Sequence, residues 1–167
     1  LARIRGECAR MNLLIEDLLQ LARVTRGDPV FEWLELDLLA REVAERVRES
    51  WPGRDIEFAI APGLRVWGDR SLLGIALANL FDNACKFTAR VPRAHIELGL
   101  RELVDAPGGR SLQQYFVRDN GAGFDVKHAT RLFVPFQRMH SQRDFPGTGI
   151  GLAIVHRIIL RHGGVLE

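Results

Sequence analysis

Four polar side chains share one face of a predicted helix: Asn79, Asp82, Asn83 and Lys86. They fall within about 100° of one another over two turns, because each helical residue is rotated by ~100° from the last. An amide oxygen suits Mg²⁺, an ammonium group binds phosphate oxygens, and a carboxylate can orient or deprotonate an attacking group. The row therefore predicts a magnesium–phosphate site with Asn83 as the metal ligand and Asp82, Asn83 and Lys86 as catalytic residues. A solvated helix face is the alternative.

A carboxylate followed by two glycines forms a second candidate. Asp119 comes directly after a predicted strand, and Gly121 and Gly123 follow it. Glycine permits positive φ and close approach of a ligand, and the carboxylate can accept a hydrogen bond from an exocyclic amine. The pattern favours a loop against a flat ligand, although hairpin and metal-binding loops look similar. It is neither a G-x-x-x-x-G-K-[ST] phosphate loop nor a G-x-G-x-x-G motif that opens a helix.

Glycines also precede the last predicted helix. Gly147, Gly149 and Gly151 alternate with Thr148 and Ile150 and lead directly into an apolar segment. Main-chain N–H groups and the positive end of the helix dipole then face the same point, which predicts an anion site. Glycines that only allow tight helix packing are the alternative.

Residues 124–146 connect the second and third motifs. A connection of this length with little structure of its own is typical of a functional lid or a disordered insert. Arg138 and Arg143 could reach a γ-phosphate when such a lid closes. The alternative is that they are solvated arginines.

Regular elements must hold these motifs together. The polar row belongs to a helix predicted over 69–88, with Asp69 as its N-cap. Its core stripe is Leu73, Leu77, Leu80, Ala84 and Phe87. Strands are predicted at 31–36, at 56–60 and 64–67 around the Pro62-Gly63 turn, and at 94–104 and 112–117, with further helices at 38–49 and 148–161. These elements predict a mixed α and β domain.

The first 27 residues carry a heptad pattern. Its apolar positions are Ile4, Cys8, Met11, Ile15, Leu18 and Ala22. An isolated helix cannot bury such a seam, so it needs a partner helix from another segment or another chain. A core helix of the following domain is the alternative. Gly27 and Pro29 end the helix, and residues 28–33 are expected to form a linker.

Composition excludes several classes of protein. The chain has 167 residues, 47% of them hydrophobic and 26% charged, as expected for one globular domain. A net charge of +2 does not predict nucleic-acid binding, and no apolar run is long enough for a membrane span. Only two of 23 basic residues are lysines, so a lysine within a motif carries weight. Cys8 and Cys85 are expected to be free, buried thiols.

The order of the motifs resembles a known family. NLFDNACKFT, DNGAGF, LFVPFQRMH and GTGIGLAIV are similar to the N, G1, F and G2 boxes of the ATP-binding catalytic domain of bacterial sensor histidine kinases. RMNLLIEDLLQLAR resembles the second helix of the dimerisation and phosphotransfer hairpin that precedes this domain. The run FQRMHSQRDFPGTGIGLAIVHRI looks most like members related to bacteriophytochromes and hybrid kinases.

The resemblance implies a fold and a set of binding residues. The fold is a two-layer α/β (α+β) sandwich, with a mixed sheet covered by helices on one face and a lid over ATP. Asn83 would bind Mg²⁺, Asn79 and Lys86 would contact phosphates, and Asp119 would bind the adenine amino group. Gly121 and Gly123 would lie beneath the base and Phe87 beside it. The expected lid hinge and phosphate side comprise Gly147, Thr148, Gly149, Gly151 and Leu152. The role of Asp82 as a base stays open.

The implied function is transfer of the ATP γ-phosphoryl group to a histidine and then to an aspartate of a response-regulator receiver domain. The histidines are His95, His128, His140, His156 and His162, and none matches the family's phosphoacceptor, so the chain alone is expected not to autophosphorylate. Residues 1–27 would be the tail of a dimerising hairpin, and 34–167 an ATP-binding domain shortened at its C-terminal end. A cytoplasmic homodimer, anchored to a membrane only through upstream segments, is expected. The alternatives are a related ATPase of the gyrase, chaperone or mismatch-repair kind, and a degenerate nucleotide-binding scaffold without kinase activity.

Overall fold

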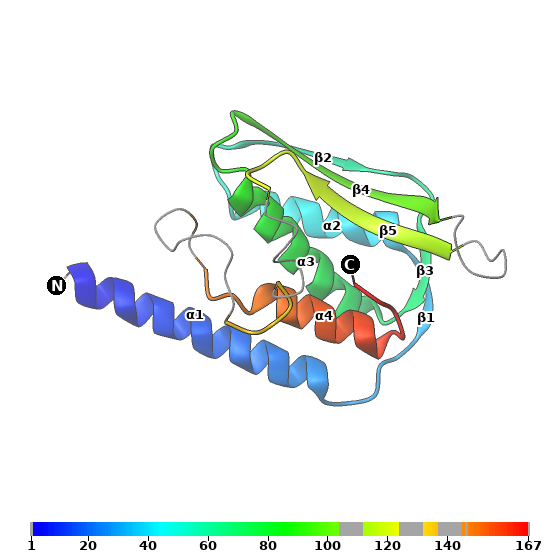
Figure 1. Cartoon of the computed structure of the whole chain (residues 1–167), viewed down its shortest axis with the longest axis horizontal. Coiled ribbons are helices and arrows are strands. Elements are labelled where there is room, and N and C mark those ends of the chain that lie inside the picture. The colour runs from blue at the N-terminus through cyan, green and yellow to red at the C-terminus, as the bar shows by residue number, and fades with distance from the viewer. Residues whose placement is uncertain (1, 104–111, 124–131, 137–144, 146, 167) are drawn as a thin grey trace.

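The computed structural model describes residues 2–103, 112–123, 132–136, 145 and 147–166. Within these residues the chain forms four helices and five strands (Figure 1). In chain order they are α1 (Ala2–Thr25), β1 (Glu32–Glu35), α2 (Leu36–Glu49), β2 (Asp55–Ile60), β3 (Arg65–Gly68), α3 (Arg70–Phe87), β4 (Arg93–Leu103), β5 (Leu112–Asp119) and α4 (Gly151–Arg161).

A three-stranded mixed sheet forms one layer. β4 lies in the middle, parallel to β2 and antiparallel to β5. Alternate residues of β4 face opposite sides: Ala94 and Ile96 are fully buried, whereas Arg93 and His95 are exposed. The sheet is thus apolar on the face toward the helices, which form the other layer (Figure 1). The predicted two-layer fold with helices on one face is confirmed.

A separate two-stranded sheet pairs β1 with β3, with Trp33 opposite Trp67. The Pro62-Gly63 turn therefore joins two strands that belong to different sheets, and they do not form a hairpin. The Asp37 carboxylate accepts from the Gly63 N–H (3.1 Å), and Leu64 O accepts from Leu36 N (2.7 Å). These bonds hold the turn against the start of α2 and direct β3 towards β1.

Helix α3 is the central helix. Asp69 is its N-cap, as predicted, because a carboxylate oxygen accepts from Leu72 N. The expected core stripe is confirmed at Leu73, Leu77 and Ala84, but Phe81 is fully buried and was not predicted. α3 contacts α2 on one side and α4 on another, so it buries more than a single stripe.

Helix α1 has two apolar faces with different surroundings. Val24 is fully buried, and Leu14 and Leu21 pack against the core where α1 runs along α4 (Figure 1). The heptad seam lies on another side, with Met11 60% exposed and Ile15 52% exposed. The predicted helix is confirmed, and it both joins the core and keeps its seam exposed. No described helix is long and apolar enough to cross a bilayer.

Candidate functional site

Three residues of the polar row on α3 lie along one line of the helix, at spacings of four and three. Asn79, Asn83 and Lys86 are all half-buried. The Asn79 amide donates to Ile75 O (2.9 Å), and the Lys86 ammonium donates to Asn83 Oδ1 (3.0 Å). The helix therefore fixes two amide oxygens and one cation in a row about two turns long.

Asp82 has a different contact. Its side chain is exposed, and Oδ1 accepts a hydrogen bond from Trp51 Nε1 (3.0 Å) in the turn after α2. The sequence placed Asp82 in the same row as Asn83 and Lys86, whereas the structure directs its carboxylate towards Trp51. Trp51 and Asp82 are 31 positions apart, which puts this contact beyond any local pattern.

The glycine-rich segment before α4 lies over this row. A Cβ on Gly147 would stand 3.0 Å from Lys86 Nζ, and one on Gly151 would stand 2.8 Å from Asn79 Oδ1. Gly147 and Gly149 have φ angles of 146° and 81°, which exclude a right-handed helix. Hence α4 begins at Gly151 and not at the predicted 148. Its N-cap, Ile150, makes no side-chain hydrogen bond to the helix. The first turn of α4 also holds no acidic residue.

Thr148 lies between two of these glycines, and Leu152 follows the last of them. The Thr148 hydroxyl is hydrogen-bonded to the Asp17 carboxylate of α1, and Leu152 is half-buried in the first turn of α4. The contact with Asp17 joins residues 131 positions apart and was not predicted. Arg138 and Arg143 lie outside the described residues.

The loop after β5 meets the C-terminal end of α3. Asp119 is the last residue of β5; its side chain is exposed and Oδ1 accepts from Gly121 N (2.8 Å). Ala122 N donates to Phe87 O (3.1 Å). A Cβ on Gly121 would lie 2.5 Å from Phe87 O, so only glycine fits there. Gly123, with φ of 62°, continues the turn.

An aromatic group lies beside this loop. The Lys86 ammonium stands 4.7 Å from the centroid of the Phe87 ring, and Phe145 meets that ring edge to face at 5.2 Å. Phe145 is 3% exposed, and the Arg90 guanidinium lies 5.4 Å from its centroid. Sequence reasoning missed Phe145; an apolar residue directly before Pro-Gly was the only local signal.

The structure thus brings all three motifs together around α3. The glycines before α4 meet Asn79 near the middle of the helix and Lys86 in its last turn, and the loop after β5 meets Phe87, the last residue of the helix. One end of the site is rich in amide, ammonium and main-chain N–H groups, which suit an anion. The other has an aromatic ring and a carboxylate, which suit a flat ligand with an amino group.

A carboxylate-rich metal centre does not fit the site. The described residues contain no group of three or more His, Cys, Asp or Glu side chains that would hold a metal ion. Two amide oxygens, those of Asn79 and Asn83, lie at the phosphate end, and Asn83 Oδ1 already accepts from Lys86. This donor set fits Mg²⁺ that arrives with phosphates and keeps its waters, because Mg²⁺ needs only one or two protein ligands in such sites.

Comparison with known proteins agrees with this geometry. The model of the histidine kinase-, DNA gyrase B-, and HSP90-like ATPase family matches residues 68–167. The signal transduction histidine-protein kinase/phosphatase MprB of Mycolicibacterium vanbaalenii is 35% identical over 162 residues, which cover 97% of this chain and 32% of MprB. MprB of Mycobacterium tuberculosis is 34% identical over 167 residues, or 31% of its length. The chain therefore spans about a third of these relatives.

Solved structures give the same assignment. A mycobacterial sensor histidine kinase MprB matches with a TM-score of 0.62 and 30% identity, covering 80% of this chain and 81% of that one. Full-length ShkA in complex with AMPPNP matches with a TM-score of 0.67 and 28% identity, covering 94% of this chain and 32% of ShkA. These names do not test the expected likeness to bacteriophytochrome-related kinases, which stays a prediction. The chain belongs to the histidine kinase-, DNA gyrase B-, and HSP90-like ATPase family, as the ATP-binding catalytic domain of a sensor histidine kinase.

Proposed function

We propose that this chain binds Mg-ATP and, within a longer protein, donates the γ-phosphoryl group to a histidine, from which it passes to an aspartate of a response regulator. The observation that carries the proposal is the meeting of two glycine loops on one helix. One loop lies against the polar residues Asn79 and Lys86, and the other lies against Phe87. The site runs along about two turns of α3, from a phosphate end at Asn79 to a base end at Phe87, with Lys86 next to the base end.

At the base end, the Asp119 carboxylate accepts a hydrogen bond from the exocyclic amino group of adenine. Gly121 and Gly123 place no side chain at their own positions beneath the base, and Phe87 offers a ring beside it. Asp119 is exposed and its Oδ1 already accepts from Gly121 N, so the carboxylate is oriented before the ligand arrives. Its other oxygen then faces the ligand.

At the phosphate end, Lys86 and Asn79 contact phosphate oxygens, together with the main chain of Gly147, Gly149 and Gly151. Thr148 and Leu152 line the same side, and the proposed contacts of the γ-phosphate include Arg138 and Arg143, which lie outside the described residues. Asn83 is the residue that would hold Mg²⁺, which would neutralise the charge on the β- and γ-phosphates. Asp82, bound to Trp51, is the least supported of the proposed catalytic residues.

In the transfer, the bond between the γ-phosphorus and the bridging oxygen breaks, a bond to a histidine nitrogen forms, and ADP leaves. The transition state is loose, with charge spread over the γ-phosphoryl oxygens. The residues of this chain therefore act by positioning and electrostatics: Lys86 and the N-terminal turn of α4 stabilise the spreading charge, and Phe87 and Asp119 fix the base.

The exposed seam of α1 supports a homodimer. Met11 and Ile15 are both more than half exposed although Leu21 and Val24 of the same helix pack against the core, and exposed apolar rows of this kind mark interaction surfaces. We place residues 1–27 in a dimerisation hairpin, 28–33 in a linker and 34–167 in the ATP-binding domain. The whole protein would present this domain in the cytoplasm, where a receiver domain is available.

Thermal unfolding with and without Mg-ADP tests the nucleotide site. Ligand at 100 times its dissociation constant adds about 2.7 kcal/mol, which raises Tm by several degrees. The shift should shrink in Asn83→Ala and persist in Asn12→Ala, which removes an exposed asparagine from α1. A folded native chain with no shift would favour the scaffold alternative, and equal shifts in all three proteins would remove Asn83 from the site.

A further inference from the structure

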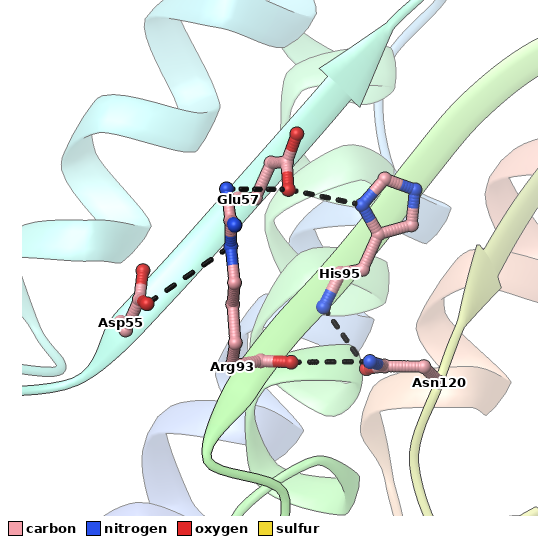
Figure 2. Close-up of polar contacts among 5 residues, drawn as sticks. All are labelled: Asp55, Glu57, Arg93, His95 and Asn120. Carbon is pink, nitrogen blue, oxygen red and sulfur yellow. Dashed lines mark hydrogen bonds and ion pairs between the residues drawn. The ribbon is translucent and has the colours of Figure 1, made fainter.

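Asn120 lies one residue beyond the end of β5 and continues its pairing with β4 in an altered form (Figure 2). Its main-chain N–H donates to His95 O (3.2 Å), as the next residue of an antiparallel ladder would. The His95 N–H donates to the side-chain Oδ1 of Asn120 (2.9 Å), where a regular ladder would use the main-chain carbonyl. The Asn120 amide also donates to Arg93 O (3.1 Å). The side chain thus replaces the main chain, which can turn away into the loop.

The end of β4 that receives these bonds is itself held in place. Ala94, between the two partner residues, is fully buried. On the outer face, the Arg93 guanidinium lies 3.1 Å and His95 Nδ1 lies 3.4 Å from the Glu57 carboxylate of β2 (Figure 2). Asn120 therefore joins the loop to a strand that is anchored on both faces.

The residues on either side of Asn120 are those of the base end. Asp119 precedes it and pairs with Ile96, and Gly121 follows it with its N–H on Asp119 Oδ1. The loop lies close against the end of α3, since a Cβ on Gly121 would stand 2.5 Å from Phe87 O and Ala122 N donates to that oxygen. A loop released from β4 would change the position of the Asp119 carboxylate relative to Phe87.

We propose that Asn120 is a positioning residue for adenine recognition: it does not touch the nucleotide but fixes Asp119 and Gly121 against β4. The inference rests on the proposed nucleotide site. Asn120 is exposed, so water could satisfy its amide. Nevertheless both polar atoms of the side chain are hydrogen-bonded to the main chain of one strand, β4. This arrangement predicts a role in the selectivity for the base, and a purely stabilising role would not affect that selectivity.

The test compares the affinities for ADP and for inosine diphosphate, which has an oxygen where adenine has its amino group. Calorimetric titration with Mg²⁺ present would give both dissociation constants for the native chain and for each variant. Asn120→Ala should weaken ADP binding about tenfold and inosine diphosphate binding less, so that the preference for ADP falls. Asn120→Asp keeps an acceptor for His95 N–H but loses the donor to Arg93 O, so its preference should be intermediate.

Arg118→Ala is the matched control. It removes a 2.5 Å ion pair with Glu97 across the same two strands without touching the loop, so the preference should stay as in the native chain. Circular dichroism would show that each variant is folded. If both folded Asn120 variants preferred ADP over inosine diphosphate as strongly as the native chain does, the proposal would be overturned, even if both ligands bound more weakly. Equal binding of the two nucleotides by the native chain would refute the proposed adenine contact of Asp119, and this proposal with it, whereas binding of neither by the folded native chain would refute the proposed function.

Discussion

Asp69 joins three segments of the chain through its carboxylate and its main-chain N–H. Its oxygens accept from Leu72 N at the start of α3 and from Val30 N in the linker, and its own N–H donates to His162 Nε2 at the end of α4. Partial burial raises the pKa of Asp69, but the hydrogen bonds from Leu72, Val30 and Ser71 outweigh it and hold the pKa below its ordinary value of 3.8.

A lowered pKa in the folded state gives a stability that is present above the ordinary pKa and lost as pH falls through the folded pKa. Asp69→Ala should therefore reduce the free energy of unfolding by about 1 kcal/mol at pH 7. The difference in this free energy between the variant and the native chain should become smaller below pH 4. Urea unfolding between pH 7 and pH 3 measures this. Asp28→Ala, at an exposed position of the same linker, should show a small effect at every pH.

The two cysteines differ more than their similar sequence surroundings predicted. Cys85 is fully buried on α3, and burial raises the pKa of its thiol to about 11. Cys8 is exposed on α1, so the expectation that both are buried was wrong for Cys8. Cys8 belongs to the heptad seam, which the fold leaves on the surface.

Thiol labelling of the folded chain at pH 8 should therefore modify one cysteine rapidly, and peptide mapping should identify it as Cys8. Because the thiolate is the reactive form, Cys85 should react only when the chain is unfolded in denaturant. Rapid modification of Cys85 in the folded chain would show that the core around α3 opens more readily than its packing indicates. Cys8→Ser should abolish the rapid phase.

At the scale of elements, α1 is attached to the ATP-binding domain at two points. The Arg161 guanidinium of α4 is hydrogen-bonded to the carbonyl oxygens of Val24 and Gly27, which would otherwise end α1 without partners. About two turns before Val24, Asp17 bonds to Thr148 between the glycines of the phosphate end. The orientation of α1 and the shape of that loop are therefore coupled.

Arg161→Ala should lower the free energy of unfolding by about 1–3 kcal/mol, because it removes charged hydrogen bonds from a helix C-terminus. Hydrogen exchange should show the loss as faster exchange in the last turns of α1, with β4 unchanged. Arg157→Ala, at an exposed position of α4, is the control and should have little effect. Unchanged protection in α1 would mean that Leu21 and Val24 hold the helix without Arg161.

Local patterns predicted the elements well and their contacts poorly. The 100° rotation per residue sufficed to align Asn79, Asn83 and Lys86, and the cap at Asp69 followed from residue type. By contrast, the partner of Asp82 is Trp51 and that of Phe87 is Phe145, and each contact depends on how distant segments pack. The pairing of β2 with β4, and not with β3, likewise depends on bonds between the turn and α2.

At the scale of the whole molecule, the seam of α1 is an apolar surface that the fold of a single chain leaves exposed. Met11, Ile15 and Leu18 are 60%, 52% and 46% exposed, while Leu14, Leu21 and Val24 on another side of the helix pack against the core. A heptad row of this kind is buried when a second helix packs against it. The domain core, around Phe81 and Ile154, forms without it.

The chain should therefore self-associate through α1, weakly, because a single helix offers a small interface. Sedimentation of the native chain over a range of concentrations should reveal a dimer that Ile15→Glu abolishes, since the charge would lie within the seam. Leu13→Glu, at a position of similar exposure outside the heptad row, should leave the association intact. Both variants should keep the Tm shift with Mg-ADP, because the nucleotide site lies within one chain. Association that survives Ile15→Glu would place the interface elsewhere on the domain.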